Sequence, residues 1–143
     1  MSGESAELDT VDALVQLSFL VQGVLTDVAA AYDVSLVQLR LFGILRDRTP
    51  GMLELATHLG LDKSSMTGLV TRAEKRGLVQ RRPSPHDGRG VLVSLTPEGH
   101  RITDLGAAEI TRRVTALCAD LTPAEAADLR GLASRIIAAA PRR

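Results

Sequence analysis

Residues 63–76 carry the side chains best suited to binding chemistry in this 143-residue chain. At helical spacing, the small hydroxyl and basic residues of this segment fall on one side and its apolar residues on the other. The polar set consists of Ser64, Gly68, Thr71, Arg72 and Lys75. Small polar side chains let a helix approach base edges in the DNA major groove, while arginine and lysine reach phosphates. The pattern favours a helix that binds duplex DNA, although taken alone it also fits an ordinary solvated helix face.

The inner face and the ends of this segment also fit a helix. Its apolar residues recur at i, i+3, i+4 and i+7, as expected for an inward face. These residues are Met66, Leu69, Val70 and Ala73. Asp62 is well placed to cap the start and Gly77 to end it. We expect the backbone N–H groups of the first turn to be free to bind a phosphate.

Two short β-branched runs follow, Val79–Arg82 and Val91–Leu95, and predict the strands of a hairpin. Prolines and glycines in the connecting loop, residues 83–90, predict a stiff approach and a tight tip. Arg81 and Arg82 alternate along the first strand, so at most one of them faces DNA directly. We take Arg82 as the candidate, and a solvated hairpin face is the alternative.

The loop adds two further candidates to the DNA-binding site. Arg89 lies at the expected tip, from which it could enter a narrow A·T-rich minor groove, where negative potential is concentrated. Asp87 is poorly suited to binding phosphate itself. We therefore expect Asp87 to pair with an arginine, such as Arg89, and to hold the shape of the loop.

A net charge of zero hides a separation of charge along the chain. Residues 1–34 contain six acids and no lysine or arginine, whereas residues 63–90 contain seven bases, Lys63 among them, and two acids. Phosphate binding depends on where positive charge is concentrated rather than on the total. The sequence therefore predicts one DNA-facing surface on a neutral-to-acidic body.

Helices are also expected at 8–32, 35–48 and 52–59, and from the capping residues Thr96 and Thr122 onward. The first of these is apolar on nearly all sides, which requires burial on more than one side. A second subunit is the expected cover, and a central core helix in a monomer is the alternative. The apolar stripe of the last helix again indicates a partner chain. In the 35–48 helix we expect the inward residues to be Leu36, Leu39, Phe42 and Ile44 or Leu45.

The stretch Leu61–Gly99 resembles the core of the MarR (multiple antibiotic resistance regulator) family. The family's D-x-R wing motif is matched by Asp87-Gly88-Arg89, and its L-T-x-x-G motif by Leu95-Thr96-Pro97-Glu98-Gly99. The order of helices on either side also matches, so the resemblance spans essentially the whole chain. It implies a mainly α fold with a small β-hairpin wing, in which a winged helix-turn-helix is flanked by N- and C-terminal dimerisation helices.

The resemblance further implies one domain over residues 1–143, with dimerisation helices at 8–32 and 100–140 and a DNA-binding lobe at 35–99. A homodimer would bind an inverted-repeat DNA operator and usually repress transcription. A small aromatic or phenolic ligand would control it. Candidate ligand-binding residues are Gln22, Tyr32 and Arg40, for which a plain core role is the alternative.

Carried over by position, Ser64 and Ser65 would contact bases or phosphates, Arg72 the DNA backbone, and the arginine at the wing tip the minor groove. Two positions depart from the family. Gly68 stands where many relatives have a longer base-reading side chain, so selectivity there is expected to come from shape or close approach. Gly88 occupies a position that is often basic, which weakens the expected grip of the wing on phosphate.

Other classes of function find little support. His58, His86 and His100 lie on separate elements and Cys118 is distant in sequence, so no metal or cofactor is expected. We expect Cys118 to be buried and inert. No nucleophile–base set can be assembled, which argues against an enzyme. Aromatic residues make up 2% of the chain, which disfavours binding of RNA or single strands.

Neither an export signal nor an apolar run of membrane-spanning length is expected, and a single cysteine fits a reducing compartment. A cytoplasmic protein with no membrane partner is therefore predicted. The alternative to DNA binding is a winged-helix module that binds another protein, with its basic face against an acidic partner.

Overall fold

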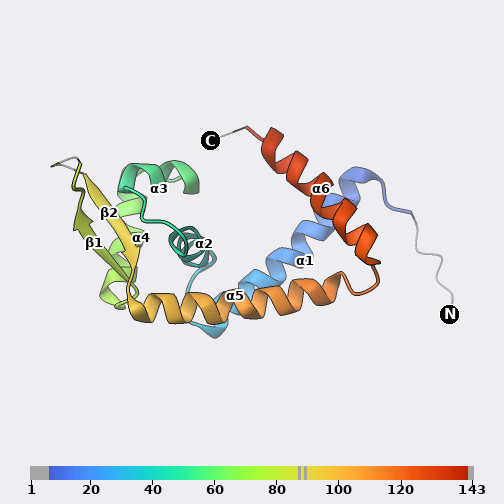
Figure 1. Ribbon diagram of the computed structural model, residues 1–143, viewed down its shortest axis with the longest axis horizontal. Coiled ribbons are helices and arrows are strands. Elements are labelled where there is room, and N and C mark those ends of the chain that lie inside the picture. The colour runs from blue at the N-terminus through green and yellow to red at the C-terminus, as the bar shows by residue number, and fades with distance from the viewer. Residues whose placement is uncertain (1–6, 87, 89, 142–143) are drawn as a thin grey trace.

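The computed structural model describes residues 7–86, 88 and 90–141. Over these residues the chain forms helices and an antiparallel hairpin in the order that the sequence predicts (Figure 1). The elements are α1 (Thr10–Ala31), α2 (Leu36–Leu45), α3 (Met52–Leu59), α4 (Lys63–Lys75), β1 (Val79–Pro83), β2 (Val91–Leu95), α5 (Pro97–Leu117) and α6 (Pro123–Ala139). The predicted fold class, mainly α with a β-hairpin wing, is confirmed.

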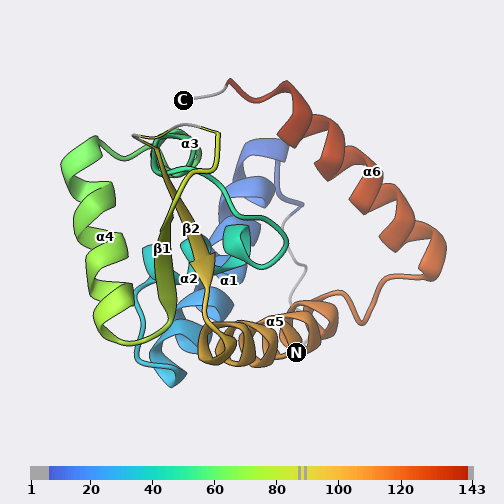
Figure 2. The ribbon, with the colours of Figure 1, turned by 60° about the vertical axis from the view of Figure 1, so that its left-hand side comes forward.

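The hydrophobic core lies at one end of the molecule, where α2, α3, α4 and the hairpin gather (Figures 1 and 2). Helix α5 runs along most of the length and packs against both α1 and α2, so it joins this end to the other. The side chains buried most completely in the core include Leu41, Leu55, Met66, Val70, Val79 and Val93. The core therefore fixes α4 and the hairpin relative to each other.

Side-chain caps explain where most of the helices begin. In five helices a capping side chain accepts a hydrogen bond from a backbone N–H of the first turn. The capping residues are Asp9, Ser35, Asp62, Thr96 and Thr122. Gly77 follows α4 as predicted, and Gly60 follows α3 in the same way. Their φ values of 73° and 65° are the left-handed conformation that glycine adopts without strain.

Helix α2 differs from the expectation in its length and in the residues that it buries. It ends at Leu45 rather than near residue 48, and Leu36 is 40% exposed although its spacing placed it inward. Leu41, which the expected stripe omits, is fully buried beside Phe42. The reason is that α2 contacts α1, α3, α5 and β2, so it is enclosed on more sides than a single stripe assumes.

The segment between α2 and α3 extends the hairpin by a short third connection. Gly51 forms an antiparallel bridge with Leu92, and the N–H of Val93 donates to the Pro50 carbonyl at 3.0 Å. From the sequence, residues 49–51 are only the gap between the helices expected at 35–48 and 52–59, because a single bridge leaves no alternating pattern. This contact holds the base of the wing against the start of α3.

The start of α5 packs closely against the turn that follows α4. The Thr96 hydroxyl donates to the Gly77 carbonyl at 2.6 Å, and the Thr96 N–H donates to the Leu78 carbonyl at 3.0 Å. Gly99 is buried at this point, and a Cβ built on it would lie 2.0 Å from the Leu78 carbonyl oxygen. Only glycine allows the two backbone segments to approach this closely.

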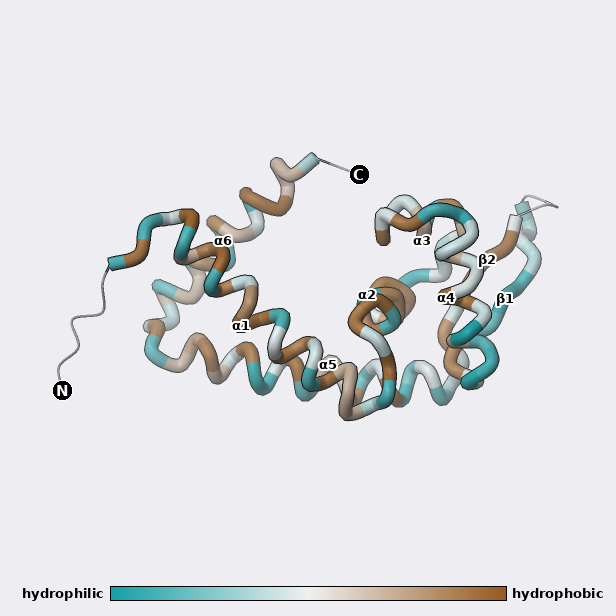
Figure 3. Tube along the Cα trace, turned by 180° about the vertical axis from the view of Figure 1, so that it is seen from behind, coloured by the Kyte–Doolittle hydropathy of each residue, from teal (hydrophilic) through white to brown (hydrophobic). Residues whose placement is uncertain are grey.

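Helices α1 and α6 leave many apolar side chains uncovered, and Figure 3 shows the hydrophobic colouring of both. Phe19 on α1 is 65% exposed and Ile137 on α6 is 74% exposed, and α6 has no buried residue. Contrary to the expectation from the sequence, α1 also has the length and composition of a membrane span, with a mean hydropathy of 1.5. Helices that are buried in protein–protein interfaces are also long and apolar. The exposed apolar residues of α1 and α6 therefore require a covering partner, and their composition alone does not distinguish a protein from a membrane.

Candidate nucleic-acid interface

Helix α4 presents the predicted polar residues to solvent. Met66, Leu69, Val70 and Ala73 are all buried, which confirms the predicted inward face. On the opposite side Ser64, Arg72 and Lys75 are exposed, and Gly68 and Thr71 are half-buried. Lys63 and Ser65 in the first turn are exposed as well. The helix therefore offers a continuous polar face on a backbone that the core holds in place.

A carboxylate occupies the start of this face. Asp62 Oδ1 accepts a hydrogen bond from the Ser65 N–H at 2.7 Å. This backbone hydrogen bond is the main cause that holds the pKa of the Asp62 carboxyl below its usual value, and a hydrogen bond from the Ser65 side chain adds to it. The expectation that the N–H groups of the first turn are free is therefore wrong for Ser65, because the cap that starts the helix takes its N–H.

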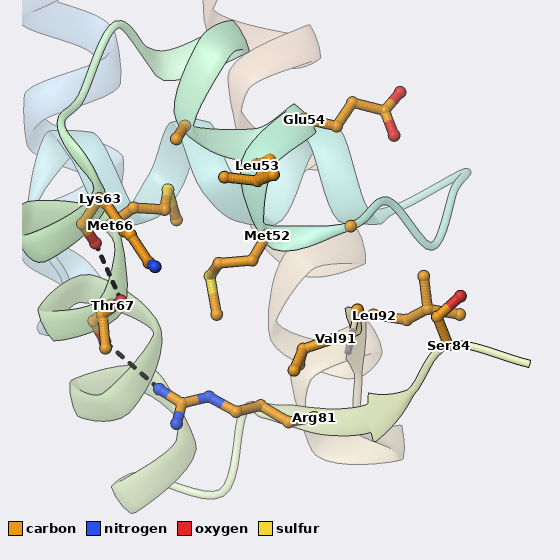
Figure 4. A pocket seen from close by; sticks show the side chains of 13 residues that line it. Met52, Leu53, Glu54, Lys63, Met66, Thr67, Arg81, Ser84, Val91 and Leu92 are labelled. Atoms are coloured by element: carbon orange, nitrogen blue, oxygen red, sulfur yellow. Dashed lines mark hydrogen bonds between the residues drawn. The ribbon is translucent and has the colours of Figure 1, made fainter. Parts of the chain in front are cut away.

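Arg81 on β1 reaches across to α4 (Figure 4). Its guanidinium donates to the Thr71 hydroxyl at 2.7 Å and to the Thr67 carbonyl at 3.3 Å. Arg81 is half-buried, and its Nε has no hydrogen-bond partner within the described part of the chain. Arg82 is exposed, so the two arginines face opposite ways as their alternation predicts. Arg81 thus links β1 to α4, and it hydrogen-bonds to the hydroxyl of Thr71, which is one of the predicted DNA contacts.

The side chain of Arg72 lies back along α4 over Gly68. A Cβ built on Gly68 would lie 3.2 Å from Arg72 Nη1, and apart from the backbone of α4 itself no other atom of the described residues would lie within 4 Å. The Arg72 guanidinium makes no hydrogen bond or ion pair with residues 7–86, 88 or 90–141. The surface above Gly68 is therefore covered by a cation that comes from one turn further along the helix.

Arg76, counted from the sequence among the bases of the DNA-facing segment, binds elsewhere. Its guanidinium donates to the Asp33 carbonyl at 2.5 Å and to the Tyr32 carbonyl at 3.3 Å, at the end of α1. Asp33 has a φ of 56°, which directs the chain from α1 into α2. No local pattern could reveal this contact, because it joins residues that are more than forty positions apart.

The wing is described only in part. The Ser84 N–H donates to the Gly90 carbonyl at 2.9 Å and closes the base of the loop. Gly88 is exposed. Asp87 and Arg89 lie outside the described residues, so the pairing expected of Asp87 and the minor-groove contact expected of Arg89 stay predictions.

None of the predicted ligand-binding residues lines the cavity that lies beside α4, so their role stays a prediction. Tyr32 is packed against the core, Gln22 is exposed ten residues earlier on α1, and Arg40 donates to the His58 carbonyl at 3.2 Å. This cavity of about 640 Å³ lies between α3, α4 and the hairpin (Figure 4). Its lining includes Met52, Leu53, Lys63, Met66, Thr67, Arg81, Val91 and Leu92. No local pattern predicts this cavity, because its walls come from α3, α4 and the hairpin.

Metal-binding and redox chemistry have no assembled site in the part of the chain that the structure describes. No three histidine, cysteine, aspartate or glutamate residues gather closely enough there to hold a metal ion. Cys118 stands at the end of α5 and is only partly buried, whereas the sequence suggested full burial. The difference arises because α5 ends here, where it is no longer enclosed by the core.

Helices α3 and α4, joined by a tight turn and followed by a two-stranded wing, define a protein of the winged-helix class. Residues 32–90 match the model of the MarR family. The multiple antibiotic resistance protein MarR of Salmonella typhimurium is 36% identical over 78 residues, which are 54% of this chain and 51% of that protein. The matched segment thus spans about half the length of this curated relative.

Solved structures extend the likeness to nearly the whole chain. Wild-type apo MarR from E. coli superposes with a TM-score of 0.76 at 24% identity, covering 92% of this chain and 98% of that one. NadR in complex with 4-hydroxyphenylacetate gives a TM-score of 0.74 at 25% identity, with 95% and 97% covered. Residues 32–90 thus match the MarR family, and the chain as a whole shares the winged-helix fold of the solved MarR structure.

Proposed function

We propose that this protein is a homodimeric regulator that binds double-stranded DNA through α4 and represses transcription in the cytoplasm. The exposed polar face of α4 carries the proposal. Hydroxyl groups on that face can bond base edges, and its cations can bind phosphates. Arg76 and Arg81 tie α4 to α1 and to β1, so the face is presented at a fixed angle.

The placement of charge on α4 supports binding in the major groove of DNA rather than binding to a flat protein surface. Lys63 and Lys75, the first and last residues of the helix, are exposed and lie about 18 Å apart along its axis. Smaller side chains, Ser64 and Thr71, lie between them. The B-DNA major groove is about 12 Å wide, so the two lysines can reach phosphates on either side while the middle of the helix approaches the bases.

A second copy of the chain is the proposed cover for α1 and α6. Their uncovered apolar residues lie at the end of the molecule opposite the wing (Figure 1). A symmetric pair joined there would project two α4 helices, which is why the operator is expected to be an inverted repeat. The two half-sites would then lie about one turn of DNA apart.

Gel shifts at two salt concentrations test the DNA-binding proposal. Duplex fragments from the gene's own neighbourhood are incubated with wild type and with Lys75→Ala. A complex that weakens with salt, and a salt slope smaller by about one for Lys75→Ala, supports a phosphate contact by that lysine. Glu74→Ala, on the adjacent exposed position, is the matched control and should not reduce binding. No salt-sensitive complex at all would favour the alternative, a winged-helix module that binds an acidic protein.

A small-molecule effector is a second proposal, and the cavity beside α4 favours it. The cavity is mainly apolar and is lined by the half-buried Arg81, whose Nε has no partner within the described chain. NadR was solved with 4-hydroxyphenylacetate, a phenol that carries a carboxylate. A carboxylate bound here would neutralise Arg81 and compete with its bond to Thr71. We therefore propose an aromatic carboxylate as the effector.

Calorimetric titration with 4-hydroxyphenylacetate as the probe tests this site. We expect wild type and Arg82→Ala to bind the probe and Arg81→Ala to bind it at least tenfold more weakly. Equal binding by wild type and Arg81→Ala would place the effector elsewhere, with Tyr32 and Arg40 as the next residues to vary.

A further inference from the structure

The bare surface at Gly68 and the side chain above it form one unit. Gly68 lies in the middle turn of the polar face and contributes no side chain of its own. Arg72 Nη1 lies within 3.2 Å of the place that a Cβ of residue 68 would take. A guanidinium therefore stands where residue 68 would otherwise present a side chain to the groove.

We propose that Arg72 determines the sequence selectivity of α4, by reading a guanine across the surface that Gly68 leaves open. The inference rests on the proposed DNA-binding function, and it changes the role of Arg72 from the backbone contact that its position suggested. A guanidinium has only donors, in a planar fork. Guanine is the base that presents two acceptors, O6 and N7, on its major-groove edge, so a fork of donors matches it in a bidentate pair.

The direction of the side chain separates base reading from phosphate binding. Helical side chains point back toward the N-terminus, and Arg72 follows this rule over one full turn. Its charge is thereby carried from the third turn to the middle of the face, between Ser64 and Thr71. Lys75, one turn further on, keeps its charge at the end of the helix, where the wall of a groove would pass.

The surroundings of Arg72 also leave its donors available. The guanidinium groups of Arg76 and Arg81 already donate hydrogen bonds to protein oxygen atoms. Arg76 donates to the carbonyl of Asp33, and Arg81 donates to the hydroxyl of Thr71. Arg72 has no such bond within the described residues. It is the cation of this helix that is placed over the centre of the face and has donors left for DNA.

Selection of duplexes from a random library, followed by affinity measurement on the selected operator and its single-base variants, tests the proposal. We expect wild type to prefer G·C at one base pair of each half-site. Arg72→Ala should lose that preference, roughly 5- to 150-fold, and keep the others. Arg72→Lys should not restore it, because an ammonium cannot form the bidentate fork.

Gly68→Ala supplies an independent check. Its methyl group would lie 3.2 Å from Arg72 Nη1, so the guanidinium must shift by a few tenths of an ångström, and selectivity should weaken at the same base pair and at no other. The double variant should lose no more there than Arg72→Ala alone, because both changes act through one contact. Alanine favours a helix more than glycine does, so the melting temperature of Gly68→Ala should not fall, which separates lost selectivity from lost folding.

The possible results separate a failure of this inference from a failure of the proposed DNA-binding function. Equal weakening of all operators by Arg72→Ala, with the base preferences kept and the salt slope reduced by about one, would make Arg72 a phosphate contact and overturn the proposal while DNA binding stands. Wild-type protein that selects no sequence would remove the proposed function itself, and this inference with it.

Discussion

Replacing Gly99 with alanine should destabilise the protein, although alanine is the better helix former. Gly99 lies in the first turn of α5, where a Cβ would stand 2.0 Å from the Leu78 carbonyl oxygen and 3.2 Å from Leu95 Cδ2. A normal contact between carbon and a carbonyl oxygen is about 3.3 Å or more. The turn after α4 must therefore move by more than about 1 Å. The Leu78 carbonyl also accepts the Thr96 N–H at 3.0 Å, so the movement strains the cap of α5.

The magnitude follows from three contributions. Overpacking of a close-packed site costs about 1–3 kcal/mol. Loss of the hydrogen bond from Thr96 to Leu78 costs about 1 kcal/mol. The higher helix propensity of alanine stabilises the variant by about 1 kcal/mol, which offsets part of this loss. The free energy of unfolding should thus fall by about 1–3 kcal/mol, which lowers Tm by roughly 2–10 °C in a chain of this size.

Urea and thermal unfolding followed by circular dichroism measure this change, at one fixed protein concentration because the Tm of the proposed dimer would depend on it. Gly43→Ala is the matched control. Gly43 lies within α2, and a Cβ there would meet nothing within 4 Å, so this variant should be as stable as wild type or up to about 1 kcal/mol more stable. If Gly99→Ala behaved like Gly43→Ala, the close approach of α5 to the turn after α4 would not be a determinant of stability.

Three other perturbations follow from contacts described above. Hydrogen bonds from Ser65 lower the pKa of the Asp62 carboxyl, so its stabilisation is present above the ordinary value of 3.8 and is lost as the pH falls through the lower folded-state pKa. Asp62→Asn, which still caps but does not titrate, should flatten the pH dependence of urea unfolding in this range, and parallel curves for the two proteins would contradict this. Arg76→Ala should lower the free energy of unfolding by about 1 kcal/mol and speed hydrogen exchange around Asp33, because two bonds to carbonyls at the end of α1 are lost; unchanged exchange there would show that the bonds contribute nothing. If the proposed dimer covers α6, Ile137→Glu should raise its dissociation constant about 100-fold or more in sedimentation equilibrium, since Ile137 is 74% exposed in the single chain and each of two copies would lose an apolar side chain from the interface; an unchanged constant would place the interface away from α6.

Local patterns were sufficient to predict the elements of the lobe. The 3–4 spacing of Met66, Leu69, Val70 and Ala73 identified the buried face of α4, because this helix packs on one side only. Capping chemistry located its start at Asp62, since the preference for a side-chain acceptor there is local. Where burial comes from several sides, as for α2, the same reasoning placed Leu36 inside and missed Leu41.

The parts of the candidate site that could not be predicted depend on long-range contacts. Arg81 was considered only as a cation on a strand, and its bond to Thr71 requires knowing that β1 passes alongside α4. The bond of Arg76 to the end of α1 has the same origin. Gly68 was recognised as unusual, but the covering of its surface by Arg72 depends on a side-chain conformation that spacing does not specify.

The joint between α4 and α1 will tolerate substitution on one side only. Arg76 binds the main-chain carbonyl oxygens of Tyr32 and Asp33. Every amino acid carries this carbonyl, so the side chains at positions 32 and 33 take no part in the contact. At position 33 the remaining restriction is the positive φ, which glycine, asparagine and aspartate accept. Position 76 itself needs a long side chain with two separate donors, which among the common residues points to arginine. Natural variants of this protein should therefore keep arginine at position 76 while the exposed position 33 varies among residues that accept a positive φ, and a pairwise covariation signal between 33 and 76 should be absent although they are in contact.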